Sequence, residues 1–321
     1  MQSVVQFDEC GGPEVLRVVE AERPDPGPGE IVVRNRFAGV NFIDTYFRSG
    51  VYPGALPGRL GQEAAGEVAA VGAGVGGLAV GDAVAYLGSQ NTYAQYTAVA
   101  AARAVRLDPQ RIPLDVGAAM LLQGLTAHAL VTRAHAVQRG EWVLVQAGAG
   151  GTGRLLVQLC ARLGAHVIAT ASTPEKAAVA RRAGAEHVLG YDGLAEAVRR
   201  IVPDGVHAVF DGVGAATFAA GLDALRREGS MVSFGNASGV VPPVRLLDLA
   251  PKNLRLLRPS LYGYLVTDAD YQRHLPALVD LVQDGALDIS VSAVYPLEDA
   301  GRAHADLQAR RTTGKLLLRI P

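Results

Sequence analysis

The residues with the clearest chemical meaning are closely spaced glycines that follow an apolar run. Trp142–Ala147 has the composition of a buried strand, and from Arg154 onward leucines recur at helical spacing. Together with a second strand at His166–Thr170, this order predicts a dinucleotide site, in which backbone N–H groups at a helix start hold a pyrophosphate. The alternative is a glycine-rich turn that binds nothing. The predicted loop residues are Gly148, Gly150, Gly151, Thr152 and Gly153. Of these, Gly148 is expected to allow the tight turn, Gly150 to let the backbone approach the pyrophosphate, and Gly153 to let the helix pack on the strand.

The end of the second strand predicts which dinucleotide binds. Sites for NAD place an acidic residue there to bind the ribose 2′-hydroxyl, but this chain has Thr170–Thr173 and then Lys176. The hydroxyl of Ser172 and the ammonium of Lys176 suit a 2′-phosphate, which favours NADPH. The alternative is that Ser172 or Thr173 caps a helix beginning at Pro174, while Lys176 is solvated.

The elements around this loop predict two domains. From residue 142 to 257 strands and helices alternate, which predicts an α/β fold with a doubly wound parallel sheet. Residues 1 to about 120 have short alternating strands separated by Gly and Pro, which predicts a compact β-barrel-like domain. A helix is expected near 113–137, and after Pro259 the pattern predicts helix, strand, helix and a last strand at Lys315–Ile320. The nucleotide domain is therefore inserted in a discontinuous first domain.

Composition narrows the class of protein. A net charge of −1 gives no electrostatic case for nucleic acid or an acidic membrane surface as a partner. The two cysteines, Cys10 and Cys160, lie far apart and are expected to be reduced thiols, with Cys160 packed in the core. The chain opens directly into a strand-like run, and no apolar stretch of membrane-spanning length lacks Gly or a charge. We therefore expect a cytoplasmic protein.

Beyond the glycine loop, several motifs along the whole chain are similar to one family. The chain resembles the zinc-free quinone oxidoreductase (zeta-crystallin-like) branch of the medium-chain dehydrogenase/reductase superfamily. The matching motifs are Asn41–Gly50 (NFIDTYFRSG), Gly61–Gly66 (GQEAAG), Gln123–Thr126 (QGLT), Gly148–Gly153 (GAGGTG), Ser233–Asn236 (SFGN), Arg258–Leu261 (RPSL) and Thr312–Lys315 (TTGK).

The resemblance implies a GroES-like β-barrel catalytic domain at residues 1–122 and 261–321, and a Rossmann domain at residues 123–260. It implies NADPH in a cleft between them and hydride transfer to a quinone or another electron-poor acceptor. It also implies a homodimer that pairs the sheet edge at Leu254–Leu257.

Zinc-dependent relatives use a Cys after the third strand and a His in a Gly-His-Glu motif. These regions here read Gly39-Val40-Asn41 and Gly61-Gln62-Glu63, so the three ligands of a catalytic zinc are missing. We therefore expect no metal. Glu63 is expected to anchor its loop.

Other site residues follow from the resemblance. Asn41, Asp44 and Tyr46 border the nicotinamide and the quinone, and Tyr46 can donate a hydrogen bond to a carbonyl oxygen that gains charge. The alternative is that Asp44 caps a short helix and Tyr46 packs. The implied cofactor-binding residues are Asn41, Thr126, Tyr191, Phe234, Asn236 and Lys315, with Tyr191 at the 2′-phosphate. For three of these an alternative remains. The Thr126 hydroxyl could form a hydrogen bond within its own helix, Asn236 could simply form a turn, and Lys315 could be a charged residue at a strand edge.

The predicted function is NADPH-dependent reduction of quinones without a metal. Two alternatives remain, an NADPH-dependent enone or enal reductase that uses the same site, and a catalytically idle NADPH-binding protein. The residues do not select the physiological acceptor, the number of electrons per step or a proton donor.

Overall fold

A computed structural model describes residues 1–88 and 91–321, which divide into two compact units. Unit 1 contains residues 1–125 and 265–321, and unit 2 contains residues 126–264. The chain therefore leaves unit 1 at residue 125, where the sequence predicts 122, and returns at 265, where it predicts 261.

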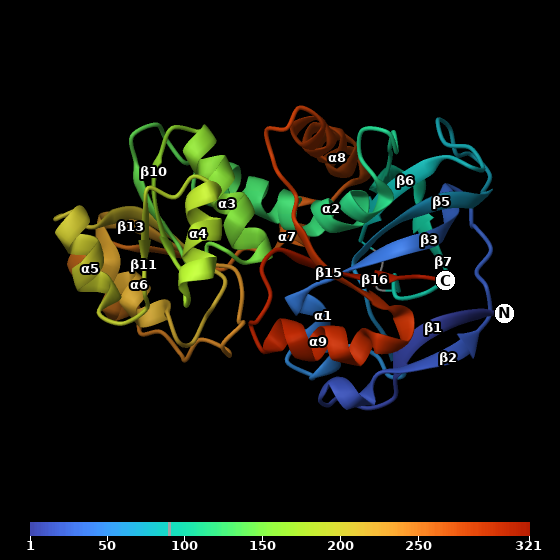
Figure 1. Ribbon diagram of the computed structural model, residues 1–321, viewed down its shortest axis with the longest axis horizontal. Coiled ribbons are helices and arrows are strands. Elements are labelled where there is room, and N and C mark those ends of the chain that lie inside the picture. The colour runs from blue at the N-terminus through green and yellow to red at the C-terminus, as the bar shows by residue number, and fades with distance from the viewer. Residues whose placement is uncertain (89–90) are drawn as a thin grey trace. The chain divides into compact units, whose positions relative to one another are not determined.

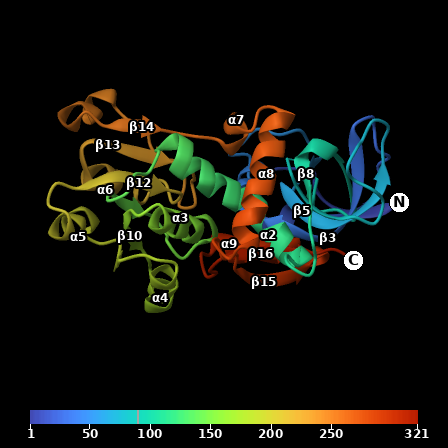
Figure 2. The same ribbon diagram turned by 90° about the horizontal axis from the view of Figure 1, so that it is seen from above.

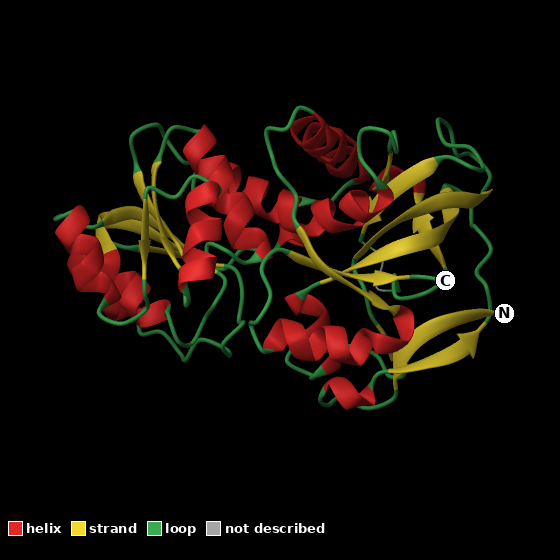
Figure 3. Cartoon of the chain, viewed as in Figure 1, coloured by secondary structure: helices red, strands yellow, loops and turns green. Residues whose placement is uncertain are grey.

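Unit 1 is rich in strands, as the yellow arrows at the right of Figure 3 show. A three-stranded sheet has the order β2-β1-β4, and a second sheet has the order β15-β16-β3-β5-β6-β8, with β7 also paired to β3. A single bridge between Val4 and Ala94 joins strand β1 to the segment before β7. The strands are β1 Gln2–Phe7, β2 Arg17–Ala21, β3 Glu30–Val40, β4 Gly58–Arg59, β5 Glu63–Val71, β6 Ala83–Leu87, β7 Tyr96–Ala100, β8 Ala104–Arg106, β15 Val291–Pro296 and β16 Lys315–Arg319.

Strand β3 is the centre of this sheet because it is long enough to pair with three others. Its first half, from Glu30 to Arg34, pairs with β7, and its last four residues, from Phe37 to Val40, pair with β16. Its apolar side chains, including Ile31 and Val33, are buried in one hydrophobic cluster with residues of β5, β6 and β16. The C-terminal strand thus completes a sheet that begins in the first forty residues.

The helices of unit 1 flank this sheet. They are α1 Phe42–Arg48, α8 Asp268–Gln283 and α9 Ala300–Gln308, with short 3-10 turns η1 Pro13–Val15, η2 Ala101–Arg103 and η5 Leu297–Asp299. The predicted helix at 113–137 is α2 Leu114–Ala129, continued by a π-helical turn η3 at Leu130–Ala134. Residues Leu114–Ala134 are long and apolar enough to cross a membrane, but 67% of this window is buried in the protein, as in a core helix.

Unit 2 is a parallel six-stranded sheet with the order β11-β10-β9-β12-β13-β14. Helices α3 and α4 lie on one face and α5 and α6 on the other, as Figures 1 and 2 show. The strands are β9 Trp142–Val145, β10 His166–Thr170, β11 His187–Leu189, β12 Val206–Asp211, β13 Leu225–Ser233 and β14 Arg255–Leu257. The helices are α3 Gly151–Arg162, α4 Pro174–Arg182, α5 Leu194–Ile201, α6 Phe218–Ala224 and α7 Leu261–Tyr264, with a 3-10 turn η4 at Leu246–Lys252.

This sheet confirms the doubly wound fold, because the strand order reverses direction between β9 and β12. Cys160 is fully buried in α3, as predicted. Within the described part of the chain, strand β14 pairs with β13 alone, so its other side is a sheet edge.

Candidate functional site

The glycine loop in unit 2 joins β9 to α3, as predicted, but its glycines act differently from the expectation. The left-handed residue of the turn is Ala147, with φ of 52°, and not Gly148. Gly148 is required by packing, because a Cβ there would lie 2.6 Å from the Cβ of Ala169. A Cβ at Gly153 would lie 2.3 Å from the Ala147 carbonyl oxygen, so Gly153 lets α3 pack against the strand, as predicted.

Two polar residues that the sequence reasoning missed hold this loop in place. The Thr170 hydroxyl accepts the Ala147 N–H at 2.9 Å and donates to Gln146 Oε1 at 2.8 Å. Gln146 and Thr170 are both buried. The sequence marks Gln146 and Thr170 only weakly, because each is simply the first polar residue at the end of an apolar strand. The first turn of α3, at Gly151 and Thr152, therefore starts from a fixed position and can present its N–H groups to an anion.

The predicted 2′-phosphate residues lie at the start of α4 and after β11. Thr173 is the N-cap of α4, because its hydroxyl accepts the Lys176 N–H at 3.3 Å, and Pro174 occupies the first helical position. Of the two predicted caps, Thr173 is therefore correct. Ser172 is exposed and does not cap, whereas Lys176 and Tyr191 are half-buried.

Phe234 and Asn236 lie in a loop at the carboxyl end of β13, where a ligand of such a sheet binds. Asn236 lies in the predicted turn, in which its carbonyl accepts the Gly239 N–H at 3.0 Å. The Phe234 ring packs on Gly212, where a Cβ would lie 2.8 Å from the ring. The backbone N–H of Ser238 donates to the Val213 carbonyl at 2.7 Å, so this loop is joined to the loop after β12.

Asp211, which the sequence reasoning missed, shapes the loop after β12. Its carboxylate accepts the N–H of Val213 at 2.7 Å and of Gly214 at 3.1 Å, and it also accepts the Thr217 hydroxyl. Burial raises the pKa of Asp211, while these donors oppose the rise. Asp211 therefore positions the loop that supports Phe234.

In unit 1, the predicted residues Asn41 and Lys315 meet Glu63 in a buried polar cluster. The Lys315 ammonium donates to Asn41 Oδ1 at 2.6 Å and forms an ion pair with Glu63 Oε1. Asn41 Nδ2 donates to Glu63 Oε1 at 3.0 Å. The Lys315 and Glu63 side chains are 1% and 0% exposed. The alternative of a strand-edge charge for Lys315 is wrong, because β16 lies between β15 and β3. The Lys315 ammonium is instead hydrogen-bonded to Asn41 and paired with Glu63.

Glu63 anchors a helix as well as this cluster. Its Oε2 accepts the backbone N–H of Leu122 at 2.7 Å, a donor in the middle of α2. In a regular helix that N–H would bond to the carbonyl of Ala118. The carboxylate therefore links β5 to α2 directly. The expectation that Glu63 anchors its own loop is corrected, since Asp44 does so.

Asp44 is a structural carboxylate that is fully buried. It accepts the Asn41 N–H at 2.9 Å, which completes a capping box on α1, the Gly61 N–H at 3.1 Å and the Tyr93 hydroxyl at 3.0 Å. Burial raises the pKa of Asp44 to about 7, although these hydrogen bonds lower it. The helix-cap alternative is therefore correct for Asp44.

The Asp44 cluster continues through residues that the sequence reasoning missed. The Tyr93 hydroxyl lies 3.2 Å from His304 Nε2, and the Arg48 guanidinium lies 3.2 Å from His304 Nδ1. Burial, assisted by Arg48, lowers the pKa of His304 to about 3, so the imidazole is neutral at pH 7. These contacts join α1 to α9, more than two hundred residues apart in sequence.

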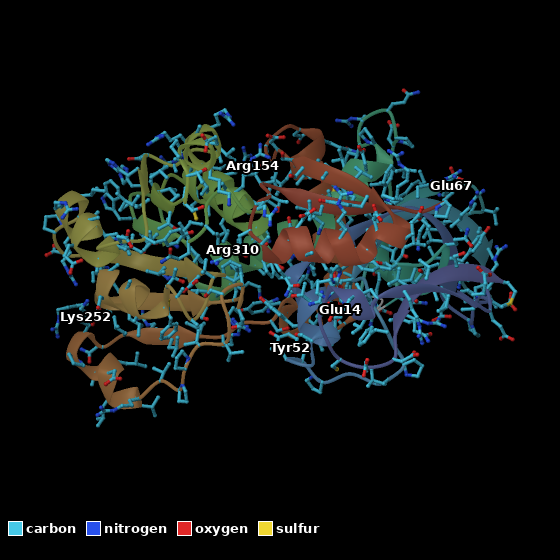
Figure 4. The ribbon with its side chains drawn as sticks, turned by 60° about the horizontal axis from the view of Figure 1, so that its bottom comes forward. Glu14, Tyr52, Glu67, Arg154, Lys252 and Arg310 are labelled. Atoms are coloured by element: carbon cyan, nitrogen blue, oxygen red, sulfur yellow. The ribbon has the colours of Figure 1, made fainter. Side chains whose placement is uncertain are left out.

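Tyr46 belongs to an aromatic group on α1 and the loop that follows it. Its ring contacts Tyr52 edge-on at 5.2 Å and Phe42 at 6.3 Å between centroids. Tyr46 is 9% exposed, whereas Phe42 and Tyr52 are half-buried; Tyr52 is labelled in Figure 4. The packing alternative for Tyr46 is therefore correct in part. The sequence reasoning missed Tyr52, a half-buried residue that extends this aromatic group.

Thr126 lies in α2 and is half-buried. Among residues 1–88 and 91–321, no group of three or more His, Cys, Asp or Glu side chains could hold a metal ion.

Comparison with known proteins agrees with this architecture. Residues 27–109 match the alcohol dehydrogenase GroES-like domain family, and residues 151–284 match the zinc-binding dehydrogenase family. A probable quinone oxidoreductase of Schizosaccharomyces pombe is 43% identical, over 98% of this chain and 96% of its own length.

Two solved structures superpose on the whole chain. A mycobacterial protein complexed with NADPH has a TM-score of 0.96 and 42% identity, with 99% of each chain covered. The quinone oxidoreductase of Escherichia coli complexed with NADPH has a TM-score of 0.95 and 40% identity, again with 99% of each chain covered.

Proposed function

This chain belongs to the quinone oxidoreductase branch of the medium-chain dehydrogenase/reductase superfamily, and from that premise we propose that it reduces quinones with NADPH. The observation that carries the proposal is the match to quinone oxidoreductases along the whole chain. When bound, NADPH supplies the hydride. The chain's own residues bind and orient the two reactants: the start of α3 holds the pyrophosphate, and Ser172, Lys176 and Tyr191 hold the 2′-phosphate.

In unit 1 the aromatic group of Phe42, Tyr46 and Tyr52 offers a stacking surface for a flat, electron-poor ring. Asp44 is excluded as a direct proton donor, because its carboxylate is fully buried and accepts three hydrogen bonds. Quinones need little acid catalysis, so a proton from water suffices to complete the hydroquinone.

Initial rates of NADPH oxidation with 1,4-benzoquinone, with an enone and with no acceptor test this function. We expect rapid turnover with the quinone and background oxidation without an acceptor. A higher kcat/KM with the enone would favour the enone reductase, and no turnover with either acceptor would favour an idle NADPH-binding protein.

We propose that the reaction does not use zinc, although one matched family is described as zinc-binding. Where zinc-dependent relatives have their Cys and His ligands, this chain has Asn41 and Gln62. The Asn41 side chain is hydrogen-bonded to Lys315 and Glu63. Activity should survive dialysis against a chelator. One zinc per chain by elemental analysis, with activity lost on its removal, would overturn this proposal.

We propose that the protein is a cytoplasmic homodimer that pairs the β14 edges of two copies. The open side of β14 and three exposed apolar side chains of unit 2 support the dimer: Val240, Leu246 and Leu247 are 62%, 80% and 73% exposed. The two unpaired cysteines support a reducing compartment. Light scattering at micromolar concentration should give twice the chain mass, and a monomer there would contradict the dimer.

A further inference from the structure

Gln123 contacts the buried cluster of unit 1 and is less buried than the members of that cluster. It belongs to α2 and is half-buried, whereas its neighbours Leu122 and Gly124 are buried. Its Nε2 donates to Asn41 Oδ1 at 3.4 Å, and within the described residues this is the one hydrogen bond of its side chain. A glutamine amide has two N–H donors and two acceptor sites. Most of its hydrogen-bonding capacity therefore remains for a ligand or water.

The residues behind Gln123 are already satisfied. Asn41 is 4% exposed, and its amide oxygen accepts from Lys315 and Gln123 while its nitrogen donates to Glu63 and the Gly39 carbonyl. Lys315 and Glu63 are more deeply buried still. The Asn41 amide therefore has no donor or acceptor left for the quinone.

The cluster also restrains where the Gln123 amide lies. Glu63 accepts the N–H of Leu122, the residue that precedes Gln123, at 2.7 Å. Asn41, which contacts the amide itself, is followed directly by Phe42, the first ring of the aromatic group. The amide of the half-buried Gln123 is thus restrained through both its side chain and its backbone, next to the start of the helix that carries the proposed stacking surface.

We propose that Gln123 is an acceptor-contacting residue whose amide N–H donates a hydrogen bond to a quinone carbonyl oxygen. This inference rests on the proposed function. As the C–H bond of the dihydronicotinamide breaks, its electron pair moves with the hydride to the quinone, and negative charge develops on the carbonyl oxygens. A proton from water then completes the hydroquinone, so Gln123 stabilises the charge without transferring a proton.

Three variants test the assignment. Gln123→Leu removes the amide while nearly preserving the volume of the side chain. Gln123→Glu places a negative charge where charge develops. Gln138→Leu is the matched control, because Gln138 is exposed in unit 2 and its Nε2 only donates to the Ala136 carbonyl.

We expect Gln123→Leu to lower kcat/KM for 1,4-benzoquinone about tenfold, the effect of one lost hydrogen bond in a partly desolvated site. Gln123→Glu should lower it further, and should regain activity as the pH falls and the new carboxylate is protonated. The Kd of NADPH, followed by its fluorescence, and the urea midpoint should stay at the wild-type values in both variants. Gln138→Leu should be indistinguishable from the wild type.

The outcomes separate this inference from the proposed function. If the wild-type protein does not reduce quinones, the proposed function is wrong and the role of Gln123 falls with it. If the wild type turns over and Gln123→Leu matches Gln138→Leu, only the assignment of Gln123 is wrong. A weaker NADPH affinity with an unchanged KM for quinone would likewise overturn it.

Discussion

Replacing Lys315 by Met removes one partner of a buried ion pair and leaves the other behind. The Glu63 carboxylate is 0% exposed, and among residues 1–88 and 91–321 its remaining donors are Asn41 and Leu122. Breaking a buried pair in this way costs about 3–5 kcal/mol, because the remaining charge is uncompensated. The total stability of a domain is about 5–15 kcal/mol, so we expect a large loss that still allows folding.

Urea unfolding followed by circular dichroism measures the effect in the whole chain. The single tryptophan, Trp142, lies in unit 2, so its fluorescence follows that unit separately. The midpoint of unit 1 should fall by about 1–2 M urea at pH 8. The double variant Lys315→Met/Glu63→Gln should recover part of the loss, because it leaves no buried charge.

Lys252→Met is the matched control for the loss of a lysine. Lys252, labelled in Figure 4, donates to the backbone carbonyls of Asp223 at 2.8 Å and Leu225 at 2.7 Å, which carry no charge, so its removal leaves no buried charge behind. A loss below about 1 kcal/mol for Lys315→Met, or an equal loss in the double variant, would refute the reasoning.

Three further predictions concern other parts of the molecule. Lys176→Ala should raise the KM for NADPH about tenfold to a hundredfold and leave the KM for NADH unchanged. The effect should be smaller at high salt. An unchanged preference for NADPH over NADH would mean that Lys176 does not bind the 2′-phosphate. Gly153→Ala should abolish NADPH binding measured by fluorescence, because the new Cβ would lie 2.3 Å from the Ala147 carbonyl oxygen, and normal affinity would contradict this contact. Burial raises the pKa of Asp44 to about 7. Its contribution to stability is therefore largest at low pH and should fall by about 3 kcal/mol between pH 5 and pH 8, a dependence that Asp44→Asn should remove from urea titrations.

The sequence predicts well those features that depend on near neighbours in the chain. The glycine loop, the parallel sheet and the Thr173 cap each arise from residues within one or two adjacent elements. The turn at Ala147 is an exception, because a left-handed alanine carries no signal of its own in the sequence.

Interactions between distant segments could not be predicted. Glu63 and Lys315 are 252 residues apart, and nothing local marks Lys315 as buried, since a lysine that starts a strand is usually solvated. The sequence likewise does not show that the Asp44 carboxylate is already hydrogen-bonded, and the resemblance alone places it beside the nicotinamide and the quinone. Its partners Gly61 and Tyr93 lie on other segments, so their hydrogen bonds, which occupy the carboxylate, are visible only in three dimensions.

The position of β16 in the sheet has a consequence for the order of synthesis. Unit 2 is continuous from residue 126 to 264, so it can fold on the ribosome once that stretch has emerged. Unit 1 cannot complete its fold at that point, because the last residues of β3 pair with β16, which is synthesised at the end of the chain. Until residue 315 is added, the ammonium that pairs with Glu63 is missing, so nascent unit 1 must keep that carboxylate hydrated. Strand β3 is thus made early but completes its pairing late. Until β16 has been made, the unpaired part of β3 is the segment of the nascent chain that chaperones would need to shield.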